Sequence, residues 1–307
     1  MKNGLAVWST PFHRDIQNHG RACASTRIGG RPTQEDRFVF VEKLDEEVGG
    51  VLMGVFDGTV GDFASNTVQK IIVGHLLNSG NWKKFCESRD DSSLVEAIRD
   101  MYKESDAELI SLCKMAGKNY ASTTAVVVVN ILGKIFVSHL GDSRACLVHK
   151  AGENYWGEFI TTDHRPDSPE ERARIERSGG SVVYLQNHNA KPFIRGGDFT
   201  VRKVQGDQPM QLQYSRAFGG KDLKNFGLSA EPDVRVIPSS RGHVGLVIAS
   251  DGLWDALSAN AVAEMVVHNS SRPDLSDLLV DRAISIQASA FIQSDNVTAM
   301  CLIFSQS

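Results

Sequence analysis

The stretch Val51-Leu52-Met53-Gly54-Val55-Phe56-Asp57-Gly58 is an apolar run that ends in Asp-Gly. A second run of the same kind, Gly245–Ser250, ends in Asp251-Gly252. Apolar runs of this length without a charge predict strands that are buried on both faces. Each carboxylate would then lie on a rigid element at the edge of the core. We expect these two acids, far apart in sequence, to meet in space.

Other acidic residues lie beside further strand-like runs. They are Glu35-Asp36 before Phe38–Val41, Asp142 after Ile135–Val137, and Asp295 before Val297–Met300. Carboxylates at close range repel one another unless they share protons or bind cations. Oxygen ligands select magnesium or manganese over zinc, which prefers nitrogen and sulfur. The pattern therefore predicts an oxygen-rich site for a hard divalent ion.

Each of these residues also has an ordinary interpretation. An Asp-Gly pair is more often a turn than a ligand, and Gly141-Asp142-Ser143 can be a hairpin turn. Asp295-Asn296 alone can be a loop, and Arg31 alone can be a solvated surface charge. The prediction of a metal site depends on several acids occurring together at the ends of strong strands.

If Asp57 bridges two ions, the other acids have natural places around them. Glu35 would complete the shell of one ion, while Asp251 and Asp295 would complete the shell of the other. The Gly58 carbonyl would serve as one more oxygen ligand. Water held between two such ions loses a proton near neutral pH and suits in-line attack on phosphorus. Arg31 could hold the phosphate through its planar fork of donors.

Composition and charge exclude several classes of protein. With 307 residues, 41% hydrophobic and 23% charged, the chain has the composition of an ordinary globular protein and can form one large domain or two small ones. The net charge of −4 gives no basic field for nucleic acid or an anionic membrane. No apolar stretch approaches the roughly 18–20 residues of a membrane helix, and residues 1–14 lack the apolar middle of a signal peptide.

The five scattered cysteines form no C-x-x-C pair and fit a reducing compartment. We predict a cytoplasmic location, with the nucleus also open.

The order of elements favours an antiparallel α+β domain. Strands and helices come in blocks rather than in strict alternation. Predicted strands are 37–42, 50–57, 122–131, 134–140, 144–149, 244–250 and 297–304, and predicted helices are 62–79, 92–116 with a cap at Ser92 or Ser93, 168–178, 259–268 and 274–289. Residues 1–20 are expected to be a loosely ordered lead-in to one domain over 21–307. The stretch 179–212 is interpreted as a surface excursion.

Ten short motifs occur along the chain in an order that is typical of one family. They are Arg31-x-x-x-Glu35-Asp36, Val55-Phe56-Asp57-Gly58-x-x-Gly61, Ser122-Thr123-Thr124-Ala125, Leu140-Gly141-Asp142-Ser143-Arg144, Asp163-His164-x-Pro166, Glu171-Arg172 with Gly179-Gly180, Ser215-Arg216-Ala217-Phe218-Gly219, Glu231-Pro232, Ala249-Ser250-Asp251-Gly252-Leu253-Trp254-Asp255 and Asp295-Asn296. The chain resembles the metal-dependent serine/threonine protein phosphatases of type 2C, from about residue 21 to 304.

This resemblance implies a fold and a site. The fold would be a central sandwich of two antiparallel sheets with helices on both outer faces, and a flap at about 163–200 would border the substrate cleft. Two magnesium or manganese ions would be bound, one by Glu35, Asp57 and the Gly58 carbonyl and the other by Asp57, Asp251 and Asp295. Asp142 and Asp251 would share a weaker third ion. Arg31 would bind the phosphate of a phosphorylated protein, metal-activated water would attack it directly, and the domain would act as a monomer.

The chain departs from the family at Thr59, where the family usually has a histidine. That histidine is thought to protonate the leaving oxygen, and losing a general acid typically slows a reaction by about 10²–10⁴-fold. Two hypotheses follow. One is a working phosphatase that is either slow or has a substitute proton donor, for which His139 and His164 are candidates. The alternative is a pseudophosphatase, a metal-containing module that binds phosphoproteins with little turnover.

Overall fold

Two six-stranded sheets pack face to face in this protein. The computed structural model describes residues 7–16, 20–186, 190–197, 199–204, 210–290 and 293–305. In spatial order, the first sheet consists of β1 (Val7–Trp8), β4 (Arg37–Val41), β5 (Val51–Phe56), β8 (Ala125–Ile131), β9 (Lys134–Leu140) and β16 (Asp233–Pro238). The second sheet consists of β11 (Asn154–Phe159), β10 (Arg144–Ala151), β17 (His243–Ala249), β18 (Val297–Ile303), β3 (Gly20–Arg27) and β2 (Phe12–Ile16). Every strand pair within them is antiparallel, so the predicted α+β sandwich is confirmed.

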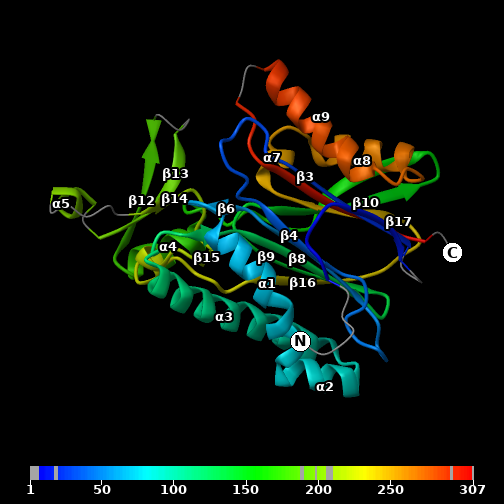
Figure 1. The fold of residues 1–307 in the computed structure, drawn as a ribbon, viewed down its shortest axis with the longest axis horizontal. Helices are drawn as coiled ribbons and strands as arrows, with labels where there is room; N and C mark the ends of the chain where they lie inside the picture. Colours follow the sequence, from blue (N-terminus) through cyan, green and yellow to red (C-terminus); the bar gives the residue numbers. More distant parts are fainter. Residues whose placement is uncertain are drawn as a thin grey trace.

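Helices cover both outer faces of the sandwich (Figure 1). The helices on the first sheet are α1 (Phe63–Asn78), α2 (Gly80–Ser88) and α3 (Asp91–Ala116). Those on the second sheet are α7 (Asp251–Trp254), α8 (Ala259–Asn269) and α9 (Leu275–Ser289). Among the described residues, none of the helices combines the length and the apolar character that a membrane crossing requires.

Strand β4 shows why the apolar runs carry no charge. Phe38 and Phe40 belong to the core between the two sheets, whereas Val39 and Val41 pack under the helices of the first sheet. Successive side chains of a strand point to opposite faces, so both faces must be apolar when both are covered. This burial holds the strands in one register and fixes the ends of the sheets, where the acidic residues lie.

Two local signals of the sequence have different outcomes. Leu132-Gly133 is a two-residue signal for a hairpin turn, and with φ of 50° and 70° these residues do make the tight turn between β8 and β9. The predicted cap of α3 at Ser92 or Ser93 is wrong, because the side chain of Asp90 accepts a hydrogen bond from the Ser93 N–H. An aspartate is an equally good N-cap, and it begins the helix one residue earlier than predicted.

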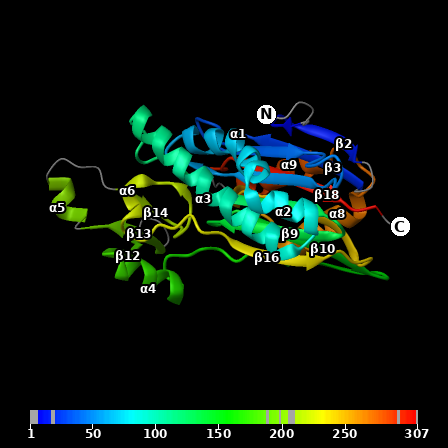
Figure 2. The same cartoon turned by 90° about the horizontal axis from the view of Figure 1, so that it is seen from below.

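A smaller part of the chain projects beyond the sandwich (Figure 1, Figure 2). It contains α4 (Pro169–Arg177), α5 (Phe199–Val204), α6 (Lys221–Lys224) and the three-stranded sheet of β12 (Gly180–Leu185), β13 (Lys191–Gly196) and β14 (Gln211–Leu212). The surface excursion predicted for 179–212 therefore contains a sheet of its own. Residues 187–189, 198 and 205–209 of this stretch lie outside the described residues.

The expectation of a loosely ordered lead-in over residues 1–20 is wrong for the residues described there. Strand β1 pairs with β4 in the first sheet, and β2 pairs with β3 in the second. Phe12 of β2 is buried between the sheets, and its ring lies 4.6 Å from that of Phe40. The segment thus adds an edge strand to each sheet. Residues 1–6 and 17–19 lie outside the described residues.

Candidate metal centre

The acidic residues lie at one end of the sandwich because of how the strands run. Asp57 follows the end of β5, Asp142 follows β9, and Asp251 follows β17. Asp36 precedes β4 and Asp295 precedes β18, whose neighbours run in the opposite direction. In antiparallel pairs, the end of one strand lies beside the start of the next. We call Asp36, Asp57, Asp142, Asp251 and Asp295 the acid cluster.

The pKa values of these carboxyl groups show that they act on one another. Burial, and then the charge of Asp251, raise the pKa of Asp57 well above its usual range. The same two causes raise the pKa of Asp142 to about 8. Burial, and then the charges of Asp255 and Asp295, raise the pKa of Asp251 to about 6. A cluster of this kind is unstable when fully ionised, so it must keep protons or bind cations.

The environment of Asp36 also fits a cation nearby. Burial, opposed in part by hydrogen bonds from Ser250 and Thr298, raises the pKa of Asp36 to about 7. The Oδ1 atom of Asp36 is buried without a hydrogen-bond partner, while Oδ2 accepts from Ser250 at 2.8 Å. A donor set made of carboxylate oxygens fits a hard divalent cation.

The backbone of Gly58 packs closely against that of Glu35. A Cβ atom at Gly58 would lie 2.7 Å from the Glu35 carbonyl oxygen, so only glycine permits this approach. The Glu35 carboxylate accepts hydrogen bonds from the Gly61 N–H at 2.8 Å and from the Thr33 hydroxyl at 2.9 Å. The carbonyl of Asp57 accepts from the Thr124 N–H at 2.9 Å. The backbone around the predicted ligands is thus fixed by direct hydrogen bonds.

Arg31 contacts the cluster through Asp295. Its guanidinium lies 2.6 Å from Oδ2 of Asp295, and both side chains are partly exposed. Asn296 fixes this geometry, because its side-chain amide donates to the carbonyls of Ile28 and Thr33 and its Oδ1 accepts from the Glu35 N–H. The segment that carries Arg31 and the segment that carries Asp295 are therefore joined into one rim.

Thr59 lies beside the cluster on a short strand. It belongs to β6 (Gly58–Thr59), which forms a small sheet with β7 (Ser122–Thr123) and β15 (Phe218–Gly219). The Thr59 hydroxyl lies 2.7 Å from the phenol oxygen of Tyr214. Tyr214 is a residue of the site that the sequence analysis missed. No signal in the sequence could have found it, because the two residues are 155 positions apart.

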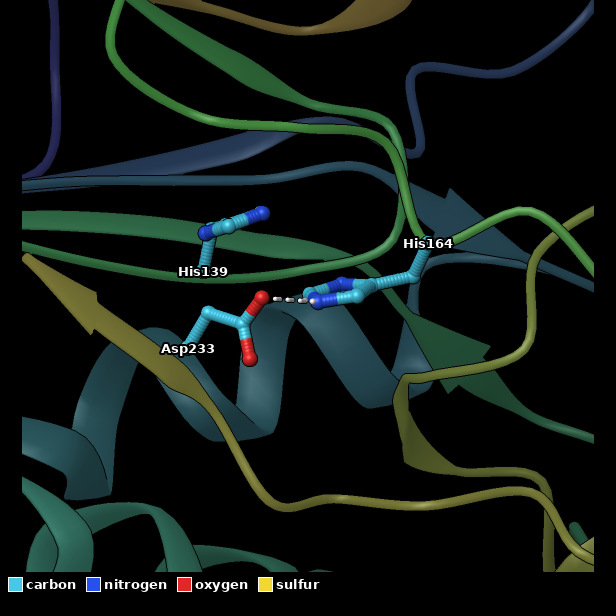
Figure 3. Close-up of side chains that lie close together, drawn as sticks. All are labelled: His139, His164 and Asp233. Atoms are coloured by element: carbon cyan, nitrogen blue, oxygen red, sulfur yellow. Dashed lines mark ion pairs between the residues drawn. The ribbon is translucent and has the colours of Figure 1, made fainter. Parts of the chain in front are cut away.

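His139 of β9, His164 of the loop between β11 and α4, and Asp233 of β16 form a separate group (Figure 3). Their ligand atoms lie within 4.8 Å of one another, close enough to hold a metal ion. However, Nδ1 of His164 accepts the Gly141 N–H at 3.1 Å, so the neutral ring carries its proton on Nε2, which faces Asp233 at 3.3 Å. Binding a metal through Nε2 would require the ring proton to move to Nδ1 and would break the hydrogen bond from Gly141, so this group fits a structural support better than a metal site.

The same geometry bears on the two histidines as substitute proton donors. Burial, and then the adjacent His164, lower the pKa of His139 to about 4, so its ring is neutral at pH 7 and has no acidic proton to give. His139 and Asp233 line a cavity of about 570 Å³, and none of the residues that line it belongs to the acid cluster. His164 instead fixes Gly141, which precedes Asp142. Both histidines therefore fit a structural role rather than that of a substitute proton donor.

Glu171 anchors the projecting part to the sandwich. Its buried carboxylate accepts from Arg174 at 2.6 and 2.7 Å and from Arg216 at 2.8 Å. Arg216 also pairs with Asp233 of β16 at 2.8 Å. Burial alone would raise the pKa of Glu171, but hydrogen bonds from Arg174, Arg216 and Ser215 lower it to about 2. The ion-pair network thus joins α4 to the edge of the first sheet.

Replacing Glu171 with alanine is expected to destabilise the protein by about 3 kcal/mol, because two partly buried guanidinium groups lose their partner. A melting curve should show a midpoint several degrees lower than that of the wild type. The exposed neighbour Glu170 provides the matched control, and Glu170→Ala should leave the midpoint unchanged. Equal melting of both variants and the wild type would contradict the anchoring role.

Comparisons with known proteins agree with this geometry. The sequence profile of the family described as Protein phosphatase 2C matches residues 24–291. Probable protein phosphatase 2C 61 of Arabidopsis thaliana is 30% identical over 310 residues, which cover 97% of this chain and 88% of that protein. Probable protein phosphatase 2C 45 of Oryza sativa subsp. japonica is 30% identical over 277 residues, which cover 90% of this chain and 84% of that protein.

Solved structures share the fold. The crystal structure of serine-threonine phosphatase 2C from Toxoplasma gondii superposes with a TM-score of 0.94 at 43% identity, and it covers 98% of this chain and 99% of that chain. The structure of a C. elegans sex determining protein, at 21% identity and a TM-score of 0.72 over 92% of this chain and 64% of that chain, supports the fold alone. The chain therefore belongs to the protein phosphatase 2C family of metal-dependent protein serine/threonine phosphatases.

Proposed function

We propose that this protein removes phosphate from phosphoserine and phosphothreonine in proteins at a centre of two magnesium or manganese ions. The observation that carries the proposal is the acid cluster, in which buried carboxyl groups at one end of the sandwich raise one another's pKa values. Divalent cations bound between the carboxylates would remove this repulsion. The cluster therefore fits divalent cations, which would supply the positive charge that these carboxylates need.

The proposed ligands follow the placement of the residues. Glu35, Asp57 and the Gly58 carbonyl would hold one ion, and Asp57, Asp251 and Asp295 the other. Asp142 would share a weaker third ion with Asp251. Ions bound there would supply Lewis acidity and bring the pKa of a coordinated water close to neutral. Asp57 belongs to both sets, so its carboxylate fixes the position of one set relative to the other.

Arg31 would bind the phosphate group of the substrate. In the structure its guanidinium is paired with Asp295, one of the proposed ligands. A cation and a guanidinium compete for the same carboxylate, so binding of an ion by Asp295 would weaken this pair. The planar fork of Arg31 would then be available to two phosphate oxygens.

Arg31→Ala is expected to lower kcat/KM by about 10²-fold, the usual cost of losing one preorganised donor to a phosphate or oxyanion. Metal affinity should stay the same or rise, since Asp295 loses a competitor. Steady-state kinetics and calorimetric titration with Mn²⁺ measure the two effects. Arg21→Ala is the matched control, because Arg21 also pairs with an aspartate but lies at the opposite end of β3. A kcat/KM that matches the wild type would contradict the assigned role of Arg31.

Hydrolysis of p-nitrophenyl phosphate tests the proposed function. It should appear with Mn²⁺ or Mg²⁺, disappear with a chelator, and disappear in Asp251→Ala. A protein that binds metal but hydrolyses neither this ester nor a phosphothreonine peptide would overturn the proposal in favour of the pseudophosphatase.

A further inference from the structure

Thr59 and Tyr214 form a buried pair of hydroxyl groups beside the acid cluster. The two oxygens lie 2.7 Å apart, while the Ser122 hydroxyl lies farther from the phenol, at 3.4 Å. The ring of Tyr214 is buried, and Thr59 is half-buried directly after Gly58. Burial raises the pKa of Tyr214, so its phenol keeps its proton at neutral pH.

The direction of the short hydrogen bond follows from the chemistry of the two groups. A phenol is a much stronger acid than an aliphatic alcohol, so it is the better donor, and the alcohol oxygen is the better acceptor. Tyr214 therefore donates and Thr59 accepts. In the part of the chain that the structure describes, Tyr214 is the only hydrogen-bond partner of the Thr59 hydroxyl, so the hydroxyl's own proton is free for a group bound beside Gly58.

We propose that Thr59 donates this proton in a hydrogen bond to the ester oxygen of the bound phosphoserine or phosphothreonine, and that Tyr214 is the positioning residue that holds Thr59 as a donor. The inference rests on the proposed function. A hydroxyl group that accepts one hydrogen bond becomes a stronger donor of the next. The ester oxygen becomes negative as its bond to phosphorus breaks, so a donor aimed at it acts mainly in the transition state.

The charges of the side chains agree with separate roles for Arg31 and for the Thr59–Tyr214 pair. Arg31 is cationic and suits the phosphate oxygens, which are charged before the reaction begins. Thr59 and Tyr214 are neutral and suit an oxygen that gains charge only during the reaction. The pair therefore stabilises a poor leaving group by a hydrogen bond, without complete transfer of a proton.

Tyr214→Phe tests the inference, because it keeps the buried ring and removes only the hydroxyl. With Mn²⁺ present, kcat for a phosphothreonine peptide should fall about tenfold, while KM stays nearly constant. The effect on p-nitrophenyl phosphate should be less than about twofold, since p-nitrophenolate leaves without help. The matched control is Tyr102→Phe, which removes a buried phenol stacked on Phe218 and should change neither rate.

Variants of Thr59 complete a double-mutant cycle. Thr59→Val removes the hydroxyl and should slow the peptide reaction as much as Tyr214→Phe does. Adding Tyr214→Phe to Thr59→Val should cause no further loss, because the two residues act through one hydrogen bond. Thr59→Ser keeps a hydroxyl group and should retain most of the wild-type rate. The comparison of Thr59→Val with Thr59→Ser tests the inference even if Tyr214→Phe folds poorly.

The possible failures of the two proposals are distinguishable. An active wild type in which Tyr214→Phe has no effect, or slows both substrates equally, overturns the role of the hydroxyl pair and leaves the phosphatase intact. Thr59→Val and Thr59→Ser variants that behave alike overturn it as well. A wild type that hydrolyses neither substrate with Mn²⁺ or Mg²⁺ overturns the proposed function, and the role of the pair with it.

Discussion

Asp57→Asn is expected to abolish metal-dependent hydrolysis, with a loss of about 10³-fold or more, and at the same time to make the metal-free protein more stable. Activity falls because Asp57 is the ligand proposed to belong to both ions, and an amide cannot replace a bridging carboxylate. Stability rises because the variant removes one member of a group of acids that repel one another. Hydrolysis of p-nitrophenyl phosphate with Mn²⁺ and urea unfolding in a chelator measure the two effects.

Asp91→Asn is the control for this experiment. Asp91 pairs with Lys134 at 2.6 Å, at the start of β9 and therefore at the end of the sandwich away from the acid cluster. It should lose no activity and gain no stability. Full activity in Asp57→Asn would show that the site is wrongly assigned, and lower stability without metal would show that Asp57 is not under electrostatic strain.

The metal-free protein is expected to lose stability as the pH rises from about 6.5 to 8.5. The pKa values of Asp36 and Asp142 are raised to about 7 and 8, and that of Asp57 is raised well above its usual range. These groups bind protons more tightly when folded than when unfolded, so the free energy of unfolding falls as they ionise. The series starts at pH 6.5 because buried His139, with its pKa lowered to about 4, destabilises the fold at lower pH. Melting curves in a chelator should shift downward by several degrees.

Saturating Mg²⁺ should raise the melting temperature most at pH 8.5 and remove most of this dependence on pH. A ligand that binds only the folded state stabilises it by mass action, and the metal replaces the lost protons. The Asp57→Asn variant should show a smaller slope in the chelator than the wild type. A metal-free protein whose stability is constant or rises between pH 6.5 and 8.5 would contradict the electrostatic account of the site.

The parts of the fold that the sequence predicted are those buried on both faces. Strands β5 and β17 were recognisable because every residue in them had to be apolar or nearly so. The edge strands β1, β2, β11 and β16 were missed, and so was the interior strand β3, whose sequence Gly20–Arg27 mixes small and polar residues without an apolar run. An edge strand has one neighbour and much contact with water, so the sequence Asp233–Pro238 of β16 alternates charged and apolar residues without a run.

The residues of the candidate site also fall into those that the sequence predicted and those that it could not predict. The acids were predicted to gather because strand ends are fixed by the core, and the structure brings Asp57, Asp142, Asp251 and Asp295 to one end of the sandwich. Tyr214 could not be predicted, because its contact with Thr59 depends on how the projecting part returns to the sandwich. Such contacts are set by tertiary packing and leave no periodic signal in the chain.

The most direct test is an anomalous difference map from crystals of the protein grown with Mn²⁺, recorded at the manganese absorption edge. The account predicts two strong peaks at the acid cluster, with Asp57 between them and Asp251 and Asp295 beside one of them. Peaks absent from the cluster, or found instead between His139, His164 and Asp233, would contradict it.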